Sequence, residues 1–172
     1  LAPSYSIADL KQSLGSSVRI VRAMPNTPAM VGEGMTGLSW SDDDFSESER
    51  TELMQFFTSF GKAETVPENL MDAVTAASGS SPAFIYMMIE ALADGVVKYG
   101  MPRDKAYTFV SQAVLGSAKM VLETGEHPGL LKDNVCSPGG TTIAAVAELE
   151  ASGFRSSLIK AASAVCDRCR NM

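Results

Sequence analysis

The stretch Ala83-Phe-Ile-Tyr-Met-Met-Ile-Glu-Ala-Leu-Ala-Asp-Gly-Val-Val-Lys-Tyr99 is apolar nearly all the way round a helix, and Gly100 follows it as a helix-ending residue. A helix with apolar side chains on every face must be buried between several others. In a helical region of only about 100 residues, such burial indicates an interface between subunits rather than a self-contained core.

The sequence around this stretch is also helical from Pro67 to the C-terminus. The pattern predicts a helix over 68–77, interrupted by Ser78-Gly-Ser-Ser-Pro82, and a long helix from Pro102 to Leu122. Small residues along the long helix allow close packing against a neighbour. A short helix over 129–132, one after Gly140 and one over 154–170 complete the region.

The first 66 residues have a different character. A short helix over 6–14 precedes strands over 18–24, 34–41 and 62–66. Between the last two strands, Ser46 and Glu49 form a capping-box pattern at the start of a helix that Gly61 is expected to close. Strands of this β-β-α-β tail need neighbours to close a core. We therefore predict a mainly α chain, with an α/β tail at 1–66 and a helical domain at 67–172.

The amino-acid composition limits the classes of molecule that this chain can bind. The chain has 172 residues, of which 45% are hydrophobic and 20% charged, as in a globular protein. A net charge of −6 argues against nucleic acid and anionic membranes, and no apolar run reaches the length of a membrane span. Three cysteines favour neither a disulfide framework nor, at Cys166-Asp-Arg-Cys169, a metal site. We expect a cytoplasmic protein without a metal.

The run Asn134-Val-Cys-Ser-Pro-Gly-Gly-Thr-Thr-Ile143 has two interpretations. It can be an ordinary helix start, with Ser137 as the cap and Pro138 at the first helical position. Alternatively, glycines at a helix N-terminus expose backbone N–H groups that bind a carboxylate or a phosphate.

Five blocks of the sequence carry a family resemblance. In order they are Met24-Pro-Asn-Thr-Pro28, Leu70-Met-Asp-Ala-Val-Thr-Ala-Ala-Ser-Gly-Ser-Ser-Pro-Ala83, Glu90-Ala-Leu-Ala-Asp-Gly95, Thr124-Gly-Glu-His-Pro-Gly129 and Lys132-Asp-Asn-Val-Cys-Ser-Pro-Gly-Gly-Thr-Thr142. They resemble the signature blocks of the Δ1-pyrroline-5-carboxylate reductases, from about Val18 to the C-terminus. Five blocks in this order and spacing make the resemblance specific.

The resemblance implies a fold and a reaction. The family transfers hydride from NADPH or NADH to the C=N bond of a cyclic imino acid, giving L-proline, and its helical domain forms an interlocked homodimer. Its Rossmann-like domain carries a G-x-G-x-x-G loop between a strand and a helix. We find no such strand-to-helix loop here, so residues 1–66 resemble the back part of that domain, and we expect this stretch alone to be inactive.

The resemblance also assigns roles to particular residues. Thr142 matches a threonine whose hydroxyl reaches the ring nitrogen, and the other substrate-binding positions are Ser137, Gly139, Gly140 and Thr141. Glu68 matches a glutamate that contacts the product, although alone it is a helix-start acid. Asn134 matches an asparagine near the cofactor ribose, although alone it is a turn residue. Asn26 lies between two prolines on a strand-end turn, where a doubly wound sheet presents cofactor-binding groups, but its side chain can equally cap its own backbone.

Three other polar residues are not expected to have a functional role. His127 is expected to be a loop residue, and Arg22 and Lys132 to be solvated. Two further functions stay open: a reductase of another cyclic imino acid, and a non-catalytic dimerisation or interaction module. The lack of the glycine loop favours the module for this stretch by itself.

Overall fold

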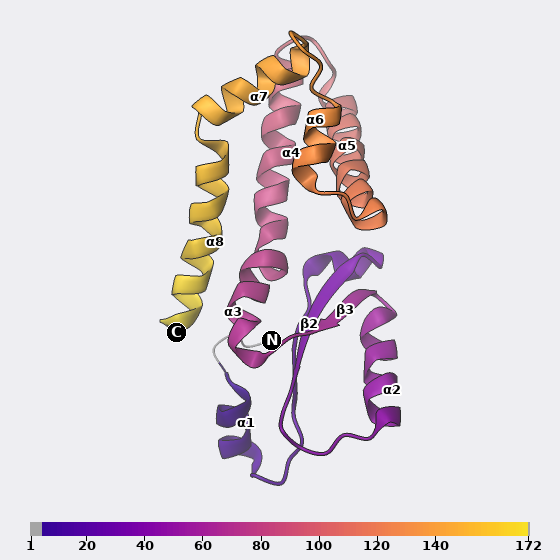
Figure 1. Ribbon diagram of the computed structural model, residues 1–172, viewed down its shortest axis with the longest axis vertical. Helices are drawn as coiled ribbons and strands as arrows, with labels where there is room; N and C mark the ends of the chain where they lie inside the picture. Colours follow the sequence, from indigo (N-terminus) through magenta and orange to yellow (C-terminus); the bar gives the residue numbers. More distant parts are fainter. Residues whose placement is uncertain (1–4, 172) are drawn as a thin grey trace. The chain divides into compact units, whose positions relative to one another are not determined.

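A computed structural model describes residues 5–171 of the chain, which folds into two compact units. The first comprises Leu1–Ala83 and Ile159–Met172, and the second comprises Phe84–Leu158. The fold is mainly α, with a small sheet before the helices, as predicted (Figure 1).

The first unit is built on a three-stranded sheet in the order β1-β2-β3. Strand β1 (Val21–Met24) is antiparallel to β2 (Gly34–Trp40), with Val21 opposite Trp40. Strand β3 (Gly61–Thr65) is parallel to β2, and helix α2 (Glu47–Thr58) makes the crossover between them. The three predicted strands are confirmed to within a few residues.

Local capping explains where the first helices begin. At α1 (Ile7–Leu14), Ser6 and Asp9 form a reciprocal capping box, and at α2 the predicted capping box of Ser46 and Glu49 is present. The expectation that Gly61 closes α2 is wrong, because that helix ends at Thr58 and Gly61 opens β3. A Cβ at Gly61 would overlap the backbone of Gly34, so glycine permits the close approach of β2 and β3.

The predicted helix over 68–77 is three different turns. A 3₁₀ turn, η2 (Glu68–Leu70), leads into α3 (Met71–Val74), and a π-helical turn, η3 (Thr75–Gly79), follows. Met71 is fully buried, and Val74 packs over Gly37 of β2, where a Cβ would collide with it. The periodicity of the sequence could not distinguish these turns, because they differ by only one residue in the spacing of their hydrogen bonds.

The second unit is helical. It contains most of α4 (Ser81–Val97), α5 (Arg103–Thr124), α6 (Pro128–Asn134), α7 (Thr141–Ala151) and the start of α8 (Phe154–Arg170). An apolar groove of about 420 Å³ lies between α4 and α5, lined by Met88, Leu92, Val96, Val110, Ala113, Val114 and Ser117. Both helices leave large apolar side chains exposed, including Met87 and Phe109.

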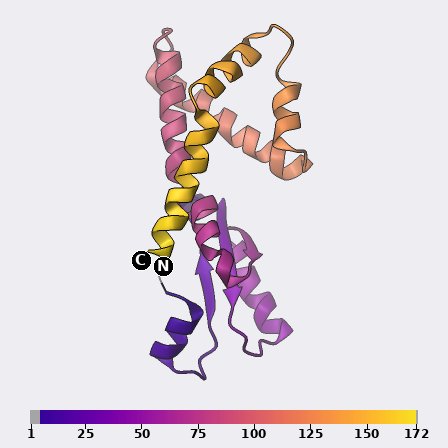
Figure 2. The ribbon, with the colours of Figure 1, turned by 60° about the vertical axis from the view of Figure 1, so that its left-hand side comes forward.

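The end of α8 belongs to the first unit, where it lies beside α3 (Figure 2). The Sγ atom of Cys166 is 3.7 Å from the carbonyl oxygen of Asp72, and burial raises the pKa of the Cys169 thiol. Over residues 5–171, no three His, Cys, Asp or Glu side chains are grouped as a metal would need. Nor is any helix in this range both long and apolar enough to cross a membrane.

Candidate active site

The glycine loop before α7 is built by two tight turns. Cys136 N–H donates to the Asp133 carbonyl at 2.9 Å, and Gly140 N–H donates to the Ser137 carbonyl at 3.0 Å. Gly139 has φ +70°, a left-handed conformation that favours glycine. A Cβ on Gly140 would overlap the Ser137 hydroxyl, so both glycines bring the chain sharply round into the helix.

Helix α7 begins at Thr141, with Gly140 as its N-cap. The expectation that Ser137 caps this helix, with Pro138 at the first helical position, is therefore wrong. The left-handed Gly139 inserts a turn between Pro138 and the helix, which sequence alone did not reveal. Gly140 has no side chain with which to cap the first turn, so the leading N–H groups of α7 are open to an external acceptor.

Thr141 and Thr142 are the first two residues of α7, and both are exposed. Their hydroxyls stand next to the open N–H groups, at the positive end of the helix dipole. The arrangement can bind a carboxylate through the backbone while presenting neutral hydroxyl groups beside it.

The residues before this loop belong to α6 or cap it. Asn134 is the last residue of α6 and is exposed. The Lys132 ammonium forms a 2.6 Å ion pair with Asp133, which raises the pKa of Lys132. His127 caps α6, because its Nδ1 accepts from the Gly129 N–H at 3.1 Å.

Glu68 lies in the first unit and serves another helix. Its Oε1 atom accepts from the Ile7 N–H, the first of α1, at 2.7 Å. The same oxygen accepts from the Arg22 guanidinium at 3.0 Å, and the Arg22 side chain is only 13% exposed. The expectation that Arg22 is simply solvated is wrong: the Glu68 carboxylate holds it against the sheet.

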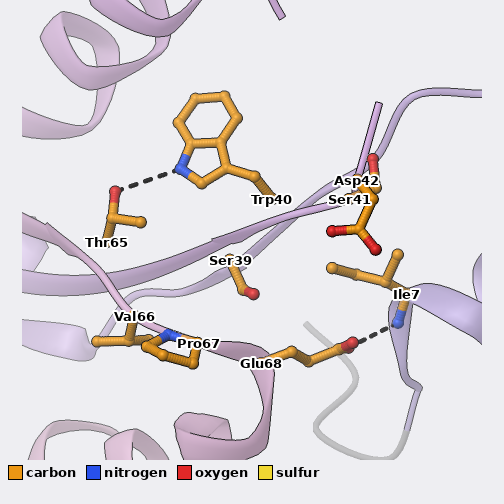
Figure 3. Close-up of a pocket in the computed structure, with 9 residues that line it drawn as sticks. All are labelled: Ile7, Ser39, Trp40, Ser41, Asp42, Thr65, Val66, Pro67 and Glu68. Carbon is orange, nitrogen blue, oxygen red and sulfur yellow. Dashed lines mark hydrogen bonds between the residues drawn. The ribbon is translucent and has the colours of Figure 1, made fainter. Parts of the chain in front are cut away.

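Glu68 also lines a pocket of about 530 Å³ at the Trp40 end of β2. Buried Ser39 and Ser41 and exposed Thr65 contribute hydroxyl groups to the pocket. Trp40 donates from its indole N–H to the Thr65 hydroxyl at 3.2 Å (Figure 3). Figure 3 shows the Glu68 carboxylate directed toward Ile7. No local pattern in the sequence predicts this arrangement, since its parts come from three separate segments.

Asn26 follows β1 and binds two backbone groups. Its Oδ1 accepts from the Met35 N–H at 2.9 Å, and its Nδ2 donates to the Ser78 carbonyl at 3.0 Å. The side chain therefore connects the start of β2 with the segment at Ser78, and it does not cap its own turn. Sequence reasoning had no means of finding the contact with Ser78, 52 residues away.

The letters G-x-G-x-x-G do occur at Gly32-Glu-Gly-Met-Thr-Gly37. This segment follows a 3₁₀ turn, η1 (Thr27–Val31), and runs into strand β2. It does not open a helix, and its first N–H groups are already used: Gly32 and Glu33 donate to carbonyls of η1, and Met35 donates to Asn26. The segment therefore does not form a phosphate-binding loop.

The predicted site residues thus fall into two groups. Asn134 and the segment Ser137, Gly139, Gly140, Thr141 and Thr142 form one loop and helix start in the second unit. Glu68 and Asn26 belong to the first unit, where each is held by its own backbone partners.

Comparison with known proteins relates this site to a family. Residues 68–172 match a family model described as pyrroline-5-carboxylate reductase dimerisation. The chain is 51% identical over 161 residues to pyrroline-5-carboxylate reductase of Escherichia coli (strain K12), covering 94% of this chain and 60% of that protein. To the Glycine max protein of the same name it is 45% identical over 172 residues, covering 100% and 62%.

Solved structures give the same relation. A crystal structure of Plasmodium falciparum pyrroline carboxylate reductase with NADP bound matches with a TM-score of 0.90 at 34% identity, covering 98% of this chain and 67% of that one. A structure from Coxiella burnetii matches with a TM-score of 0.91 at 34% identity, covering 98% and 62%. The chain spans about 60% of the length of the curated relatives it matches.

Proposed function

The chain belongs to the pyrroline-5-carboxylate reductase family, and we propose that it is the substrate-binding and dimerisation part of such a reductase. The whole enzyme would reduce the C=N bond of 1-pyrroline-5-carboxylate to give L-proline, in the cytoplasm. The observation that carries this proposal is the 51% identity to a reductase of that name across nearly the whole chain.

In this proposal the start of α7 binds the substrate carboxylate. The N–H groups of Thr141 and Thr142 lie in the exposed first turn of α7 and have no acceptor within the helix, whereas the Gly140 N–H is used by the Ser137 carbonyl. A carboxylate there would be stabilised by hydrogen bonds and by the helix dipole together. The Ser137 hydroxyl, beside Gly140, adds a further donor.

Thr142 would orient the ring nitrogen. Its hydroxyl lies one residue into the helix and is exposed, so it can hydrogen-bond a nitrogen of a ring whose carboxylate is held at Gly140. A neutral hydroxyl is a weak acid, and its contribution is therefore to position the imine and to relay a proton to nitrogen as the carbon receives hydride.

The bound nicotinamide, as NADPH or NADH, would supply that hydride. Among residues 5–171 no glycine loop joins a strand to a helix, so this stretch does not fit the phosphates of the cofactor. We propose that Asn134 and the turn held by Asn26 contribute only the edge of the cofactor site, and that the stretch alone has no turnover.

Glu68 would contact the amine of the product through its second oxygen. Its Oε1 atom is used by Ile7 and Arg22, whereas Oε2 makes no hydrogen bond to the described residues. A carboxylate oxygen held in this way can accept a hydrogen bond from the product amine. Glu68→Gln should raise KM for the imino acid several-fold in the intact enzyme.

The test of the reductase proposal is Thr142→Ala in the intact protein that contains this chain. Turnover should fall about 10- to 1000-fold, the effect of removing one positioned polar group. The melting temperature should change little, because an exposed first-turn hydroxyl contributes only about 1 kcal/mol. Thr142→Ser should restore much of the activity.

The matched control is Thr108→Ala, which removes an exposed helical hydroxyl that bonds only its own helix at Asp104. Gly140→Val should weaken substrate binding instead, by covering the N–H groups. Unchanged turnover and substrate affinity in a folded Thr142→Ala dimer would contradict the site. Substrate profiling of the wild-type enzyme distinguishes pyrroline-5-carboxylate from other cyclic imines.

A dimerisation module is the second candidate for the stretch by itself. The apolar α4–α5 groove and the match to a dimerisation family support it. Self-association of the stretch without reductase activity fits both proposals, so activity of the intact protein decides between an enzyme part and a module.

A further inference from the structure

The π-helical turn η3 interrupts an otherwise continuous helical path from α3 to α4. Its Ser80 N–H donates to the Thr75 carbonyl at 2.8 Å, a bond across five residues. Turns of this kind are rare and frequently occur at functional sites. The Ser78 carbonyl has no helical donor four residues further on, because that residue is Pro82, which has no N–H.

The Asn26 side chain donates a hydrogen bond to that carbonyl. Because the Met35 N–H can only donate and the Ser78 carbonyl can only accept, the amide orientation is fixed, with Oδ1 toward Met35 and Nδ2 toward Ser78. One side chain thus connects the turn after β1, the start of β2 and the π-turn.

Packing on the same side supports this connection. Thr75 and Ala76 are buried, and the Thr75 hydroxyl donates to the Met71 carbonyl at 2.9 Å. Met24, the last residue of β1, is also buried, and its Sδ would lie 3.8 Å from a Cβ added to Gly79, so its side chain borders the π-turn. The π-turn therefore packs against the end of β1, and the hydrogen bond from Asn26 links the two.

We infer that Asn26 is a positioning residue that holds the π-turn, and so fixes the hydroxyl-bearing segment from Ser78 to Ser81 at the start of α4. Its role in the reaction, which rests on the proposed function, is then to place this segment rather than to bind the cofactor directly. Its acceptor and one of its two N–H groups are already committed to the backbone.

The test is Asn26→Asp in the intact protein. Aspartate has the same shape and keeps an acceptor for the Met35 N–H, but it turns a carboxylate oxygen toward the Ser78 carbonyl. We expect hydrogen exchange at the Ser80 amide to accelerate at least tenfold. We also expect kcat, calculated from the concentration of enzyme that binds cofactor, to fall at least tenfold. KM for the cofactor should stay within about twofold of wild type.

The matched control is Asn171→Asp, which alters another amide that donates to a backbone carbonyl, that of Asp167, at the exposed end of α8. It should leave both readouts unchanged. Asn26→Ser, which is too short to bridge the two groups, serves as the second variant if aspartate prevents folding, and its exchange should accelerate in the same way.

The inference is overturned if exchange at Ser80 is unchanged in a folded variant, or if KM for the cofactor rises tenfold while kcat holds. Faster exchange in a protein that has no reductase activity even as wild type would support the link made by Asn26 and reject the proposed function.

Discussion

The hydroxyl of Thr36 is fully buried in β2 and has no hydrogen-bond partner within residues 5–171. A buried polar group without a partner costs about 1–3 kcal/mol. Thr36→Val keeps the shape and removes the unpaired oxygen. We expect it to raise the free energy of unfolding by about 1 kcal/mol in urea titrations, with an unchanged m-value.

The matched control for Thr36 is Thr75→Val. The Thr75 hydroxyl is also nearly buried, but it donates to the Met71 carbonyl. This second substitution should destabilise the protein. A loss of stability in Thr36→Val as large as that in Thr75→Val would mean that the Thr36 hydroxyl is satisfied after all.

Two glycines with positive φ should respond differently to alanine. A Cβ at Gly61 would overlap Gly34, whereas at Gly139 no atom lies within 4 Å and only the left-handed backbone opposes it. Gly139→Ala should therefore cost about 1 kcal/mol, and Gly61→Ala more than about 3 kcal/mol, by disrupting the β2–β3 pairing. Calorimetric melting of both variants measures the difference, and equal losses would refute the steric argument.

At the scale of elements, the start of α2 combines a capping box with an ion pair. Glu49 accepts two bonds from the Arg19 guanidinium, at 2.6 and 2.9 Å, and caps at Ser46. Mainly because of Arg19, the pKa of Glu49 is lowered from 4.5 to about 2. Between these values the unfolded chain binds a proton that the folded protein does not.

The contribution of Glu49 to stability is therefore complete above pH 4.5 and is lost as the pH falls toward 2. Glu49→Gln should make the melting temperature fall less steeply across this window than in the wild type. The control is Glu52→Gln, which removes a charge from the same helix but keeps the Arg19 pair. Identical pH profiles for wild type and Glu49→Gln would show that this pair does not stabilise the fold.

Elements with local signals were the predictable ones. The capping box of Ser46 and Glu49 located the start of α2, and the apolar pattern after Phe154 gave the bounds of α8. The errors lie where distant contacts decide. Gly61 belongs to β3 because Gly34 approaches it closely, and the π-turn at Thr75–Gly79 is seated on β1 and tied by Asn26.

The same division holds for the candidate site. A glycine turn leading into a helix was predictable, because glycines and small polar residues determine it locally, whereas the cap was not, because the left-handed Gly139 moves the helix start to Thr141. The pairing of Glu68 with Ile7 and Arg22 was not, because the partners are 61 and 46 residues away. Charge and helix propensity at Glu68 pointed only to its own turn.

For the whole molecule, the exposed apolar faces of α4 and α5 predict a homodimer. Leu92 lines the groove between them and is 49% exposed, so glutamate at this position would place a charge in a buried interface. Leu92→Glu should convert the protein to monomers or prevent its folding, as measured by light scattering.

The control for the dimer is Lys119→Glu, at an exposed position of α5, where the lysine pairs with Glu123 and with no other carboxylate among residues 5–171. It should remain dimeric. A wild-type chain that is a stable monomer at micromolar concentration would contradict the prediction, as would a fully dimeric Leu92→Glu variant.

Trp40 is the single tryptophan of this chain, and it lies in the first unit. Phe45 packs edge-on against its ring at 5.1 Å, and the Arg50 guanidinium lies 4.8 Å from the ring centroid. Its fluorescence therefore reports the melting of the sheet alone, whereas far-ultraviolet circular dichroism is dominated by helices of both units. Coincident transitions by the two probes would show that the units unfold as one cooperative body, and separate transitions that the helical unit is stable without the sheet.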